Sequence, residues 1–391
     1  MLGESKINKL YLIFVLFLPF SWASIAVGSI YRLITILLFA LFILQRNFKI
    51  FVPMKKRRLF NAWAIYVIYS CSSVIWGGFT SQQITIAFGM ALLFLISLVF
   101  IGTVVEDTES NKLDVMWIIA TAFFVVLFIT GSKVSLGWST RQTLIILGTE
   151  TDANEFASFF AVGLSVITGM VLSTKNIFQK TILALLFLGG IYVVLMSGSR
   201  GALLALFVAI VTTLFFSNRL SMRGLIVICI VGTVLYFVFY TFVIDLIPEN
   251  TLARLSIEAL TADNGSGRGF IWKNALSDFW GGNILRIIFG YGYGGLYAPT
   301  GYGTVTSTMH NQFLQNLINY GVVGFILYLR LIWLTLKEYW MTKRTYLGCF
   351  IGILVMGLTI TMGPSYKILW ILIMIPMLSI SSGAEDECYD E

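Results

Sequence analysis

Charged residues are scarce in this chain of 391 residues. Lys, Arg, Asp and Glu together make up 12% of the sequence, whereas 58% of the residues are hydrophobic. This leaves too little polar surface to cover a water-soluble core. The composition therefore excludes a soluble globular protein and indicates a polytopic membrane protein.

Cysteine and histidine are also rare. Of the four cysteines, three lie in apolar runs and one lies in the C-terminal tail, so the longest hydrophilic segment has none. A disulfide framework in that segment is excluded. The single histidine, His310, has no cysteine pair beside it in the sequence and cannot form a zinc site with one. We expect neither a metal nor another cofactor.

Apolar runs long enough to cross about 30 Å of hydrocarbon recur along the chain. We count twelve, over residues 10–29, 31–45, 59–79, 84–104, 115–131, 154–173, 179–196, 200–216, 224–244, 312–336, 344–363 and 365–380. The first run lacks a small-residue cleavage site, so we expect a retained helix rather than a signal peptide. The predicted fold is all-α, with nine transmembrane helices in 1–244, a large outer loop at 245–309, three helices in 310–380 and an acidic cytoplasmic tail at 381–391.

The basic residues predict the orientation, because Lys and Arg concentrate in cytoplasmic loops. With both termini inside, sixteen of the 26 basic residues fall in inner loops and nine in outer loops, while Arg330 lies within a helix. This excess supports the orientation with both termini inside. The net charge of +7 is thus mainly a topology signal, and the KKRR cluster at 55–58 is expected to contact anionic lipid headgroups rather than nucleic acid.

The predicted outer loop, residues 245–309, is too rich in aromatic side chains for a disordered segment. Apolar spacings of three and four predict short amphipathic helices over 251–260 and 270–280, lying on the membrane surface as a lid. The run FGYGYGGLYAPTGYG (289–303) alternates glycine with tyrosine, which favours a carbohydrate site because tyrosine faces stack on sugar rings. The alternative is an aromatic loop at the level of the lipid headgroups.

His310 stands where this loop meets the next apolar run. Imidazole titrates near neutral pH, so His310 is a candidate for proton transfer, and an interfacial hydrogen-bonding role is the alternative. Arg200, Arg268 and Arg286 fall on the predicted outer side, where the positive-inside bias disfavours them. For each arginine the alternative is a snorkelling or salt-bridged side chain.

Several short motifs occur in a fixed order. Arg200 is followed by three residues and Leu204, and His310-Asn311 by nine residues and GVVG (321–324). TDANEFASFF (151–160) opens a predicted central helix, and SGRGFIWKNAL (266–276) precedes IIFGYGYGGL (287–296). In this order and on one predicted side of the membrane, they resemble the O-antigen ligase and polymerase superfamily of bacterial membrane glycosyltransferases. The resemblance covers most of the chain.

The resemblance implies an enzyme of the bacterial plasma membrane that uses neither a metal nor a nucleotide sugar. Its relatives transfer glycan from an undecaprenyl-diphosphate carrier onto an acceptor hydroxyl at the outer face. By their place in the motifs, Arg200 and Arg268 are expected to bind the donor diphosphate and His310 to act on the acceptor. The expected substrate-binding residues are Arg286, whose match is less close, Asn311, Trp272, Tyr291, Tyr293, Asp152 and Asn154.

The chemistry of these residue types agrees with such roles. Cleavage of a bond between sugar and diphosphate builds negative charge, which arginine meets through bidentate hydrogen bonds. A base such as His310 helps the acceptor hydroxyl, with outer carboxylates as competitors at positions 150, 152, 155, 245, 249, 258, 263 and 278. Direct attack predicts inversion at the anomeric carbon. A helix N-cap is the alternative role for Asp152, and Gly321 and Gly324 are expected to permit close helix packing.

The leading hypothesis is a polysaccharide polymerase that joins lipid-linked repeat units. A ligase that attaches finished glycan to a lipid A core or another acceptor is the main alternative. A transporter or flippase for lipid-linked sugars is an alternative of another class, but transporters place ionisable groups or broken helices at the bilayer midplane. The predicted helices have neither, apart from Arg330. The expected partners are the lipid-linked oligosaccharide and membrane lipid, and a flippase and a chain-length regulator are candidates.

Overall fold

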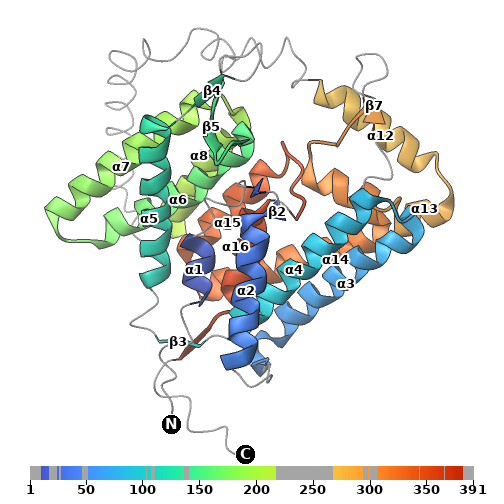
Figure 1. Cartoon of the computed structure of the whole chain (residues 1–391), viewed down its shortest axis with the longest axis horizontal. Helices are drawn as coiled ribbons and strands as arrows, with labels where there is room; N and C mark the ends of the chain where they lie inside the picture. Colours follow the sequence, from blue (N-terminus) through green and yellow to red (C-terminus); the bar gives the residue numbers. More distant parts are fainter. Residues whose placement is uncertain are drawn as a thin grey trace, which may run out of the picture. The chain divides into compact units, whose positions relative to one another are not determined.

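The computed structural model describes residues 10–16, 24–25, 28–45, 52–102, 104–106, 111–131, 133–135, 141–216, 267–293, 298–299, 306–342, 344–364 and 366–381. These residues are mostly helical (Figure 1). They divide into two compact units. Unit 1 comprises Met1–Ala120, Gly267–Thr342 and Gly357–Glu391, and unit 2 comprises Thr121–Ser266 and Lys343–Met356. The predicted outer-loop helix over 251–260 and the predicted span 224–244 lie outside the described residues.

Six helices in the described ranges are long and apolar enough to cross a membrane. They are Met54–Gly77, Ser81–Ile101, Lys112–Thr130, Ala153–Ser173, Ile177–Met196 and Gln312–Met341, and each overlaps a predicted span. Four shorter apolar helices occupy Ile30–Gln45, Arg200–Phe216, Tyr346–Met356 and Lys367–Met377. The chain is therefore a helical membrane protein. The count of twelve spans and the orientation stay predictions.

Three predicted spans differ from the structure. Within the described part of the run 10–29, helix α1 covers Leu10–Leu16, and a short hairpin pairs β1 (Ser24–Ile25) with β2 (Gly28–Ser29). Helix α15 (Arg344–Met356) ends well before residue 363, and α16 (Lys367–Met374) gives way to a 3₁₀ turn, Ile375–Met377. Each run contains glycine or proline, which lower helix stability, and hydropathy alone does not register them.

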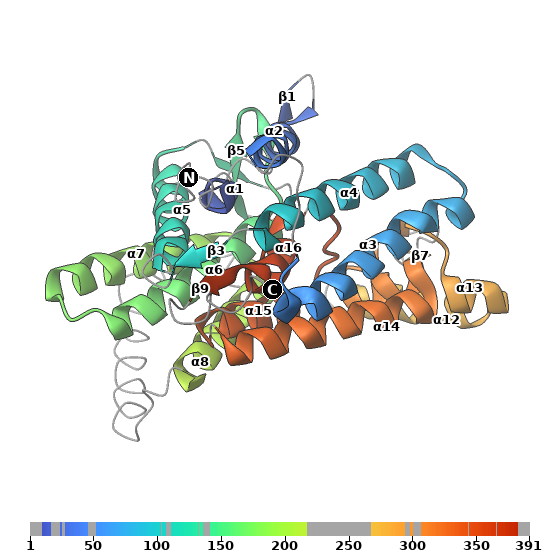
Figure 2. The same cartoon turned by 90° about the horizontal axis from the view of Figure 1, so that it is seen from below.

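Unit 1 is built around α3 (Arg57–Gly77), which packs between α4 (Ser81–Ile101) and α14 (Gln312–Met341). Figures 1 and 2 show α12 (Arg268–Trp280) and α13 (Ile284–Phe289) gathered at one end of these three helices. Short strands complete the unit: β3 (Val104–Glu106) pairs in parallel with β9 (Ser379–Ser381), and β7 (Ala298–Pro299) pairs antiparallel to β8 (Thr306–Ser307). Helix α2 (Ile30–Gln45) packs on α4.

Buried aromatic rings fill the interior of unit 1. Trp63 and Tyr66 of α3 face Trp370 of α16, with ring centroids 5.4 Å and 6.1 Å from the Trp370 ring. Tyr328 of α14 lies 5.6 Å from Tyr66. At the opposite end from α12, the Lys56 ammonium is 2.9 Å from the Glu338 carboxylate, which joins the start of α3 to the end of α14. Aromatic packing therefore holds α3, α14 and α16 together.

Unit 2 contains α6 (Ala153–Ser173), α7 (Ile177–Met196), α8 (Arg200–Phe216) and α15, with a small antiparallel sheet of β4 (Lys133–Ser135), β5 (Gln142–Ile146) and β6 (Thr149–Glu150). Helices α6, α8 and α15 pack tightly against one another. Gly348 and Gly352 allow this, because a Cβ at either position would lie 2.7 Å from a backbone oxygen of α8. The Ser165 and Thr213 hydroxyls, 2.6 Å apart, bond α6 to α8. The helix α5 (Asn111–Thr130) spans the boundary between the units.

Helix α14 is broken at Gly321, where φ is 64° and ψ is −170°. The prediction of an uninterrupted helix over 312–336 is therefore wrong, whereas the expected close packing at Gly321 is confirmed, because the backbone of the α13 segment lies against it. Only glycine adopts this conformation easily, and a Cβ there would collide with the backbone around Ile288. Gly324 does pack closely, since a Cβ at that position would lie 2.8 Å from the Tyr69 ring.

The break frees carbonyls that would otherwise bond within the helix. Ile318 O accepts a hydrogen bond from Tyr291 N (3.0 Å) and Asn319 O accepts one from Gly292 N (2.9 Å). The hydroxyl of Tyr69 donates to Tyr320 O (3.0 Å). Buried carbonyls are thus satisfied by the segment that follows α13 and by α3, which fixes both against α14.

We predict that Gly321→Ala destabilises the protein by more than about 2 kcal/mol, because it adds a backbone collision to the roughly 1–2 kcal/mol of left-handed strain. Gly148→Ala is the matched control, since Gly148 also has positive φ (78°) but a Cβ there meets nothing within 4 Å. Thermal unfolding in detergent should show a larger loss for Gly321→Ala. Equal midpoints for the two variants would contradict this account of the break.

Candidate functional site

His310 is half-buried and adopts a left-handed conformation, with φ of 47°. It directly precedes Asn311, the N-cap of α14, whose side-chain oxygen accepts from Phe313 N and Leu314 N, both at 3.0 Å. A left-handed residue other than glycine costs roughly 1–2 kcal/mol. The surrounding contacts must therefore hold His310 in place.

Those contacts converge on its neighbour Met309, which is fully buried. Trp272 of α12 donates from Nε1 to Met309 O (2.7 Å), and Met309 N donates to Gln315 Oε1 of α14 (3.0 Å). Ile271, Ala275 and Phe279 of α12 form one apolar cluster with Met309 and Ile318. The backbone that carries His310 is thus clamped between α12 and α14.

Arg268 is the first residue of α12 and is half-buried. Gly267 precedes it with φ of 74°, a conformation that glycine adopts without strain and that lets the chain turn into the helix. Trp272 lies four residues further on and so shares a helix face with Arg268. One face of α12 therefore carries both the predicted diphosphate ligand and the tryptophan that bonds beside His310.

Arg286 and Tyr291 make contacts within the protein. Arg286 donates to Trp76 O at the end of α3 (2.9 Å), and its guanidinium lies 5.5 Å from the centre of the Tyr291 ring. The Tyr291 hydroxyl donates to Asp278 O (3.3 Å). Trp76 Nε1 donates in turn to Phe289 O (3.0 Å). These bonds fix the segment 284–291 to α3 and α12, a structural role that the sequence did not indicate for either residue.

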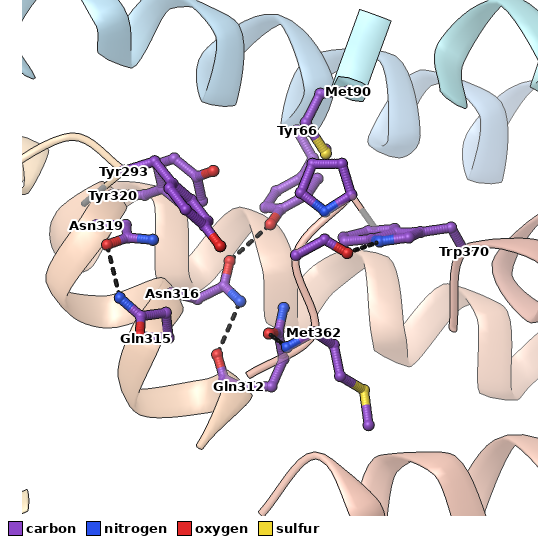
Figure 3. A pocket seen from close by; sticks show the side chains of 12 residues that line it. Tyr66, Met90, Tyr293, Gln312, Gln315, Asn316, Asn319, Tyr320, Met362 and Trp370 are labelled. Atoms are coloured by element: carbon purple, nitrogen blue, oxygen red, sulfur yellow. Dashed lines mark hydrogen bonds between the residues drawn. The ribbon is translucent and has the colours of Figure 1, made fainter. Parts of the chain in front are cut away.

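Tyr293 lines a polar cavity in unit 1, together with side chains of α3, α4, α14 and the 362–370 segment (Figure 3). The cavity has room for about one water molecule. Its lining residues are Tyr66, Met90, Tyr293, Gln312, Gln315, Asn316, Asn319, Tyr320, Met362, Gly363, Pro364 and Trp370. The structure thus separates two tyrosines of one glycine-rich run: Tyr291 packs on α12, and Tyr293 faces the cavity.

In unit 2, Asp152 is the N-cap of α6 and accepts from Asn154 N (2.8 Å) and Glu155 N (2.9 Å). The alternative role that its position suggested is therefore confirmed. Asn154 Oδ1 accepts from Arg141 (2.8 Å) and from the Ser199 hydroxyl (3.0 Å). This network reaches the turn immediately before Arg200, the first residue of α8.

Arg141 is the residue of this network that the sequence did not single out. Besides its bond to Asn154, its Nε donates to Ser197 O (2.9 Å), so one guanidinium ties the start of α6 to the turn that opens α8. In the sequence, Arg141 is only one of the nine basic residues in the predicted outer loops. Its position before the TDANEF motif carried no signal, because the contact depends on how β5 and α6 fold back on each other.

The described residues contain no group of three or more His, Cys, Asp and Glu side chains that could hold a metal ion. Among the competing carboxylates, Asp245, Glu249, Glu258 and Asp263 lie outside the described residues. Glu150 and Asp278 are exposed in the described part of the chain.

Comparison with known proteins points to one family. Residues 183–329 match the family model described as O-antigen ligase, a stretch that contains Arg200, Arg268, Arg286 and His310. No curated protein sequence matches the chain significantly. A chain solved in work on "Structural coordination of polymerization and crosslinking by a peptidoglycan synthase complex" is 15% identical, with 82% of this chain and 96% of that chain covered and a TM-score of 0.48. A TM-score this low does not establish a shared fold.

The matched region runs from within α7 to α14 and so includes α12 and the clamped backbone around His310. It carries every motif noted in the sequence except TDANEFASFF (151–160). Over residues 183–329, the chain is therefore similar to the O-antigen ligase family, which supports the resemblance noted in the sequence.

Proposed function

We propose that this membrane protein is a polysaccharide polymerase. It transfers a growing glycan from undecaprenyl diphosphate onto a sugar hydroxyl of the next lipid-linked unit, at the outer face of the plasma membrane. The observation that carries the proposal is the conformation of His310, which is strained and yet held from two sides by Trp272 and Gln315 through Met309. Strain that the surroundings maintain is typical of functional sites.

In the proposed reaction, His310 accepts the proton of the acceptor hydroxyl as that oxygen attacks the anomeric carbon. The bond from the anomeric carbon to the diphosphate oxygen breaks, and undecaprenyl diphosphate leaves with the bonding electron pair. Attack opposite the leaving group inverts the anomeric configuration, and a retained configuration in the product would rule this mechanism out. In this metal-independent mechanism, the charge on the leaving oxygens is met by Arg268, whose guanidinium group stays protonated. The role of Arg200, in unit 2, as a ligand of the donor diphosphate stays a separate prediction.

A ligase is the second candidate, and the family description of residues 183–329 favours it. Both enzymes break the same bond and differ in the acceptor. One feature supports the transporter alternative. Helix α14 is broken at Gly321, whereas the sequence predicts no broken helix, and broken helices are typical of transporters. The break is, however, filled by backbone bonds from the 291–292 segment rather than left for an ion.

The deciding experiment supplies purified protein with undecaprenyl-diphosphate oligosaccharide alone and then with a lipid A core acceptor. A ladder of products from the donor alone is the result expected of a polymerase. A single shifted acceptor band would instead identify a ligase. Translocation of the carrier without a new glycosidic bond would defeat both enzyme hypotheses.

We predict that His310→Gly lowers the transfer rate by about 10²- to 10⁴-fold, the usual contribution of a general base. Glycine adopts positive φ freely, so a lower rate in this variant would not come from added backbone strain at this position. His310→Asn is a second variant that tolerates the left-handed backbone but cannot act as a base at neutral pH. Near-normal transfer by either variant would remove His310 from the mechanism.

We predict that Arg268→Ala lowers the transfer rate by an amount equivalent to roughly 2.7–4 kcal/mol, by analogy with the loss of one oxyanion-stabilising donor. Arg268→Lys should recover only part of the rate, because lysine cannot form a bidentate contact with phosphate. Lys273→Ala is the matched control, since Lys273 is an exposed cation on the same helix. A comparable loss in the control would show a general charge effect instead of a specific contact.

A further inference from the structure

Four carboxamide side chains form a buried row on the first half of α14. Gln312, Gln315, Asn316 and Asn319 are spaced by three, one and three residues, which places them along one face of the helix, and each is at most 4% exposed. Burial of carboxamides in a membrane protein is costly unless every group finds a partner. This row therefore needs an explanation beyond helix packing.

The amide groups are already oriented by bonds to one another and to α3. The Tyr66 hydroxyl donates to Asn316 Oδ1 (2.6 Å), and Asn316 Nδ2 donates to Gln312 O (2.8 Å). Gln315 Nε2 donates to Asn319 Oδ1 (2.9 Å). Figure 3 shows these bonds along one wall of the cavity, with Tyr293 and Tyr320 beside each other at one end. A ligand entering the cavity would meet groups that need no reordering.

The lining indicates the chemistry of such a ligand. None of the twelve lining residues is charged, so the cavity does not suit a phosphate or a carboxylate. Carboxamides and phenols both donate and accept hydrogen bonds, as a neutral hydroxyl requires. With room for about one water molecule, the cavity fits a single hydroxyl group rather than a whole sugar ring.

Gln315 connects this cavity to the backbone beside His310. Its Nε2 bonds Asn319 in the cavity wall, while its Oε1 accepts from Met309 N. Gln312, another lining residue, lies two positions after His310. Its Oε1 accepts a hydrogen bond from the backbone N of Met362, which also lines the cavity. A hydroxyl bound in the cavity would thus be held by the same helix turn that carries the proposed base.

We propose that the cavity lined by Tyr293 and the carboxamide row is a specificity subsite that takes one non-reacting hydroxyl of the acceptor sugar. This inference rests on the proposed function, because it assigns the cavity to the acceptor on which His310 acts. Such a subsite would make the enzyme select between acceptors. An acceptor analogue that lacks this hydroxyl would be used poorly, because the buried amides would lose a hydrogen-bond partner.

The test uses a panel of acceptor oligosaccharides, each of which lacks one hydroxyl of the terminal sugar. The donor, an undecaprenyl-diphosphate-linked oligosaccharide, is kept at a saturating concentration. With the wild-type protein, one member should be used at least about 10-fold less efficiently than the parent acceptor. The variant Tyr293→Phe removes one polar group from the lining. Its KM for the parent acceptor should rise by roughly 2- to 10-fold with kcat little changed. The difference in efficiency between the parent acceptor and the poorly used panel member should become smaller than in the wild type.

Tyr339→Phe is the matched control for this change. It removes a hydroxyl from another buried tyrosine of unit 1, but one that bonds Leu372 O outside the cavity, so discrimination between acceptors should stay at the wild-type level. Tyr320→Phe, which also removes a hydroxyl from the lining, should behave like Tyr293→Phe.

Two results would overturn the subsite while leaving the proposed function intact: equal use of every panel member by the wild type, or unchanged acceptor KM and discrimination in both cavity variants. The cavity would then be a polar packing site that holds water only. Absence of transfer by the wild type with every acceptor would instead overturn the proposed function, and the subsite with it.

Discussion

The break in α14 at Gly321 is the constraint on which the arrangement of unit 1 depends. Without it, the carbonyls of residues 318–320 would bond within the helix, and the backbone of residues 291–292 would have no acceptors there. The break turns these carbonyls outward, where Tyr291, Gly292 and Tyr69 bond them. One glycine therefore joins the end of the α12–α13 segment to the middle of a membrane-spanning helix.

This attachment determines the surroundings of His310. With the 290–292 segment fixed on α14, α12 lies against the start of the same helix, and its apolar face packs on Met309 and Ile318. Trp272 then reaches Met309 O, and the left-handed conformation of His310 is locked by bonds on its N-terminal side and by the Asn311 cap on its C-terminal side. The strain at His310 is thus maintained by hydrogen bonds between side chains of α12 and α14 and the backbone on either side of His310.

Much of the architecture was predictable because it follows from hydropathy and local chemistry. The long apolar helices, the helix at 268–280 and the N-cap at Asp152 all rest on residues close together in sequence. Predictions failed where glycine or proline outweighed hydropathy, as in the run 10–29 and after Met356. The break at Gly321 was missed for a related reason, since a glycine in an apolar helix reads equally well as a packing position.

The sequence by itself determined a helical membrane protein, motifs that resemble those of the O-antigen ligase family, and a short set of polar residues as site candidates. Only the tertiary structure decided how those residues are used: Trp272 beside Met309, Arg286 on Trp76, Tyr291 on α12 and Tyr293 in the cavity. The physical reason is that each of these contacts joins segments far apart in the chain. Hydrogen-bond partners at such separations depend on where the helices pack and break, which the local sequence pattern does not encode.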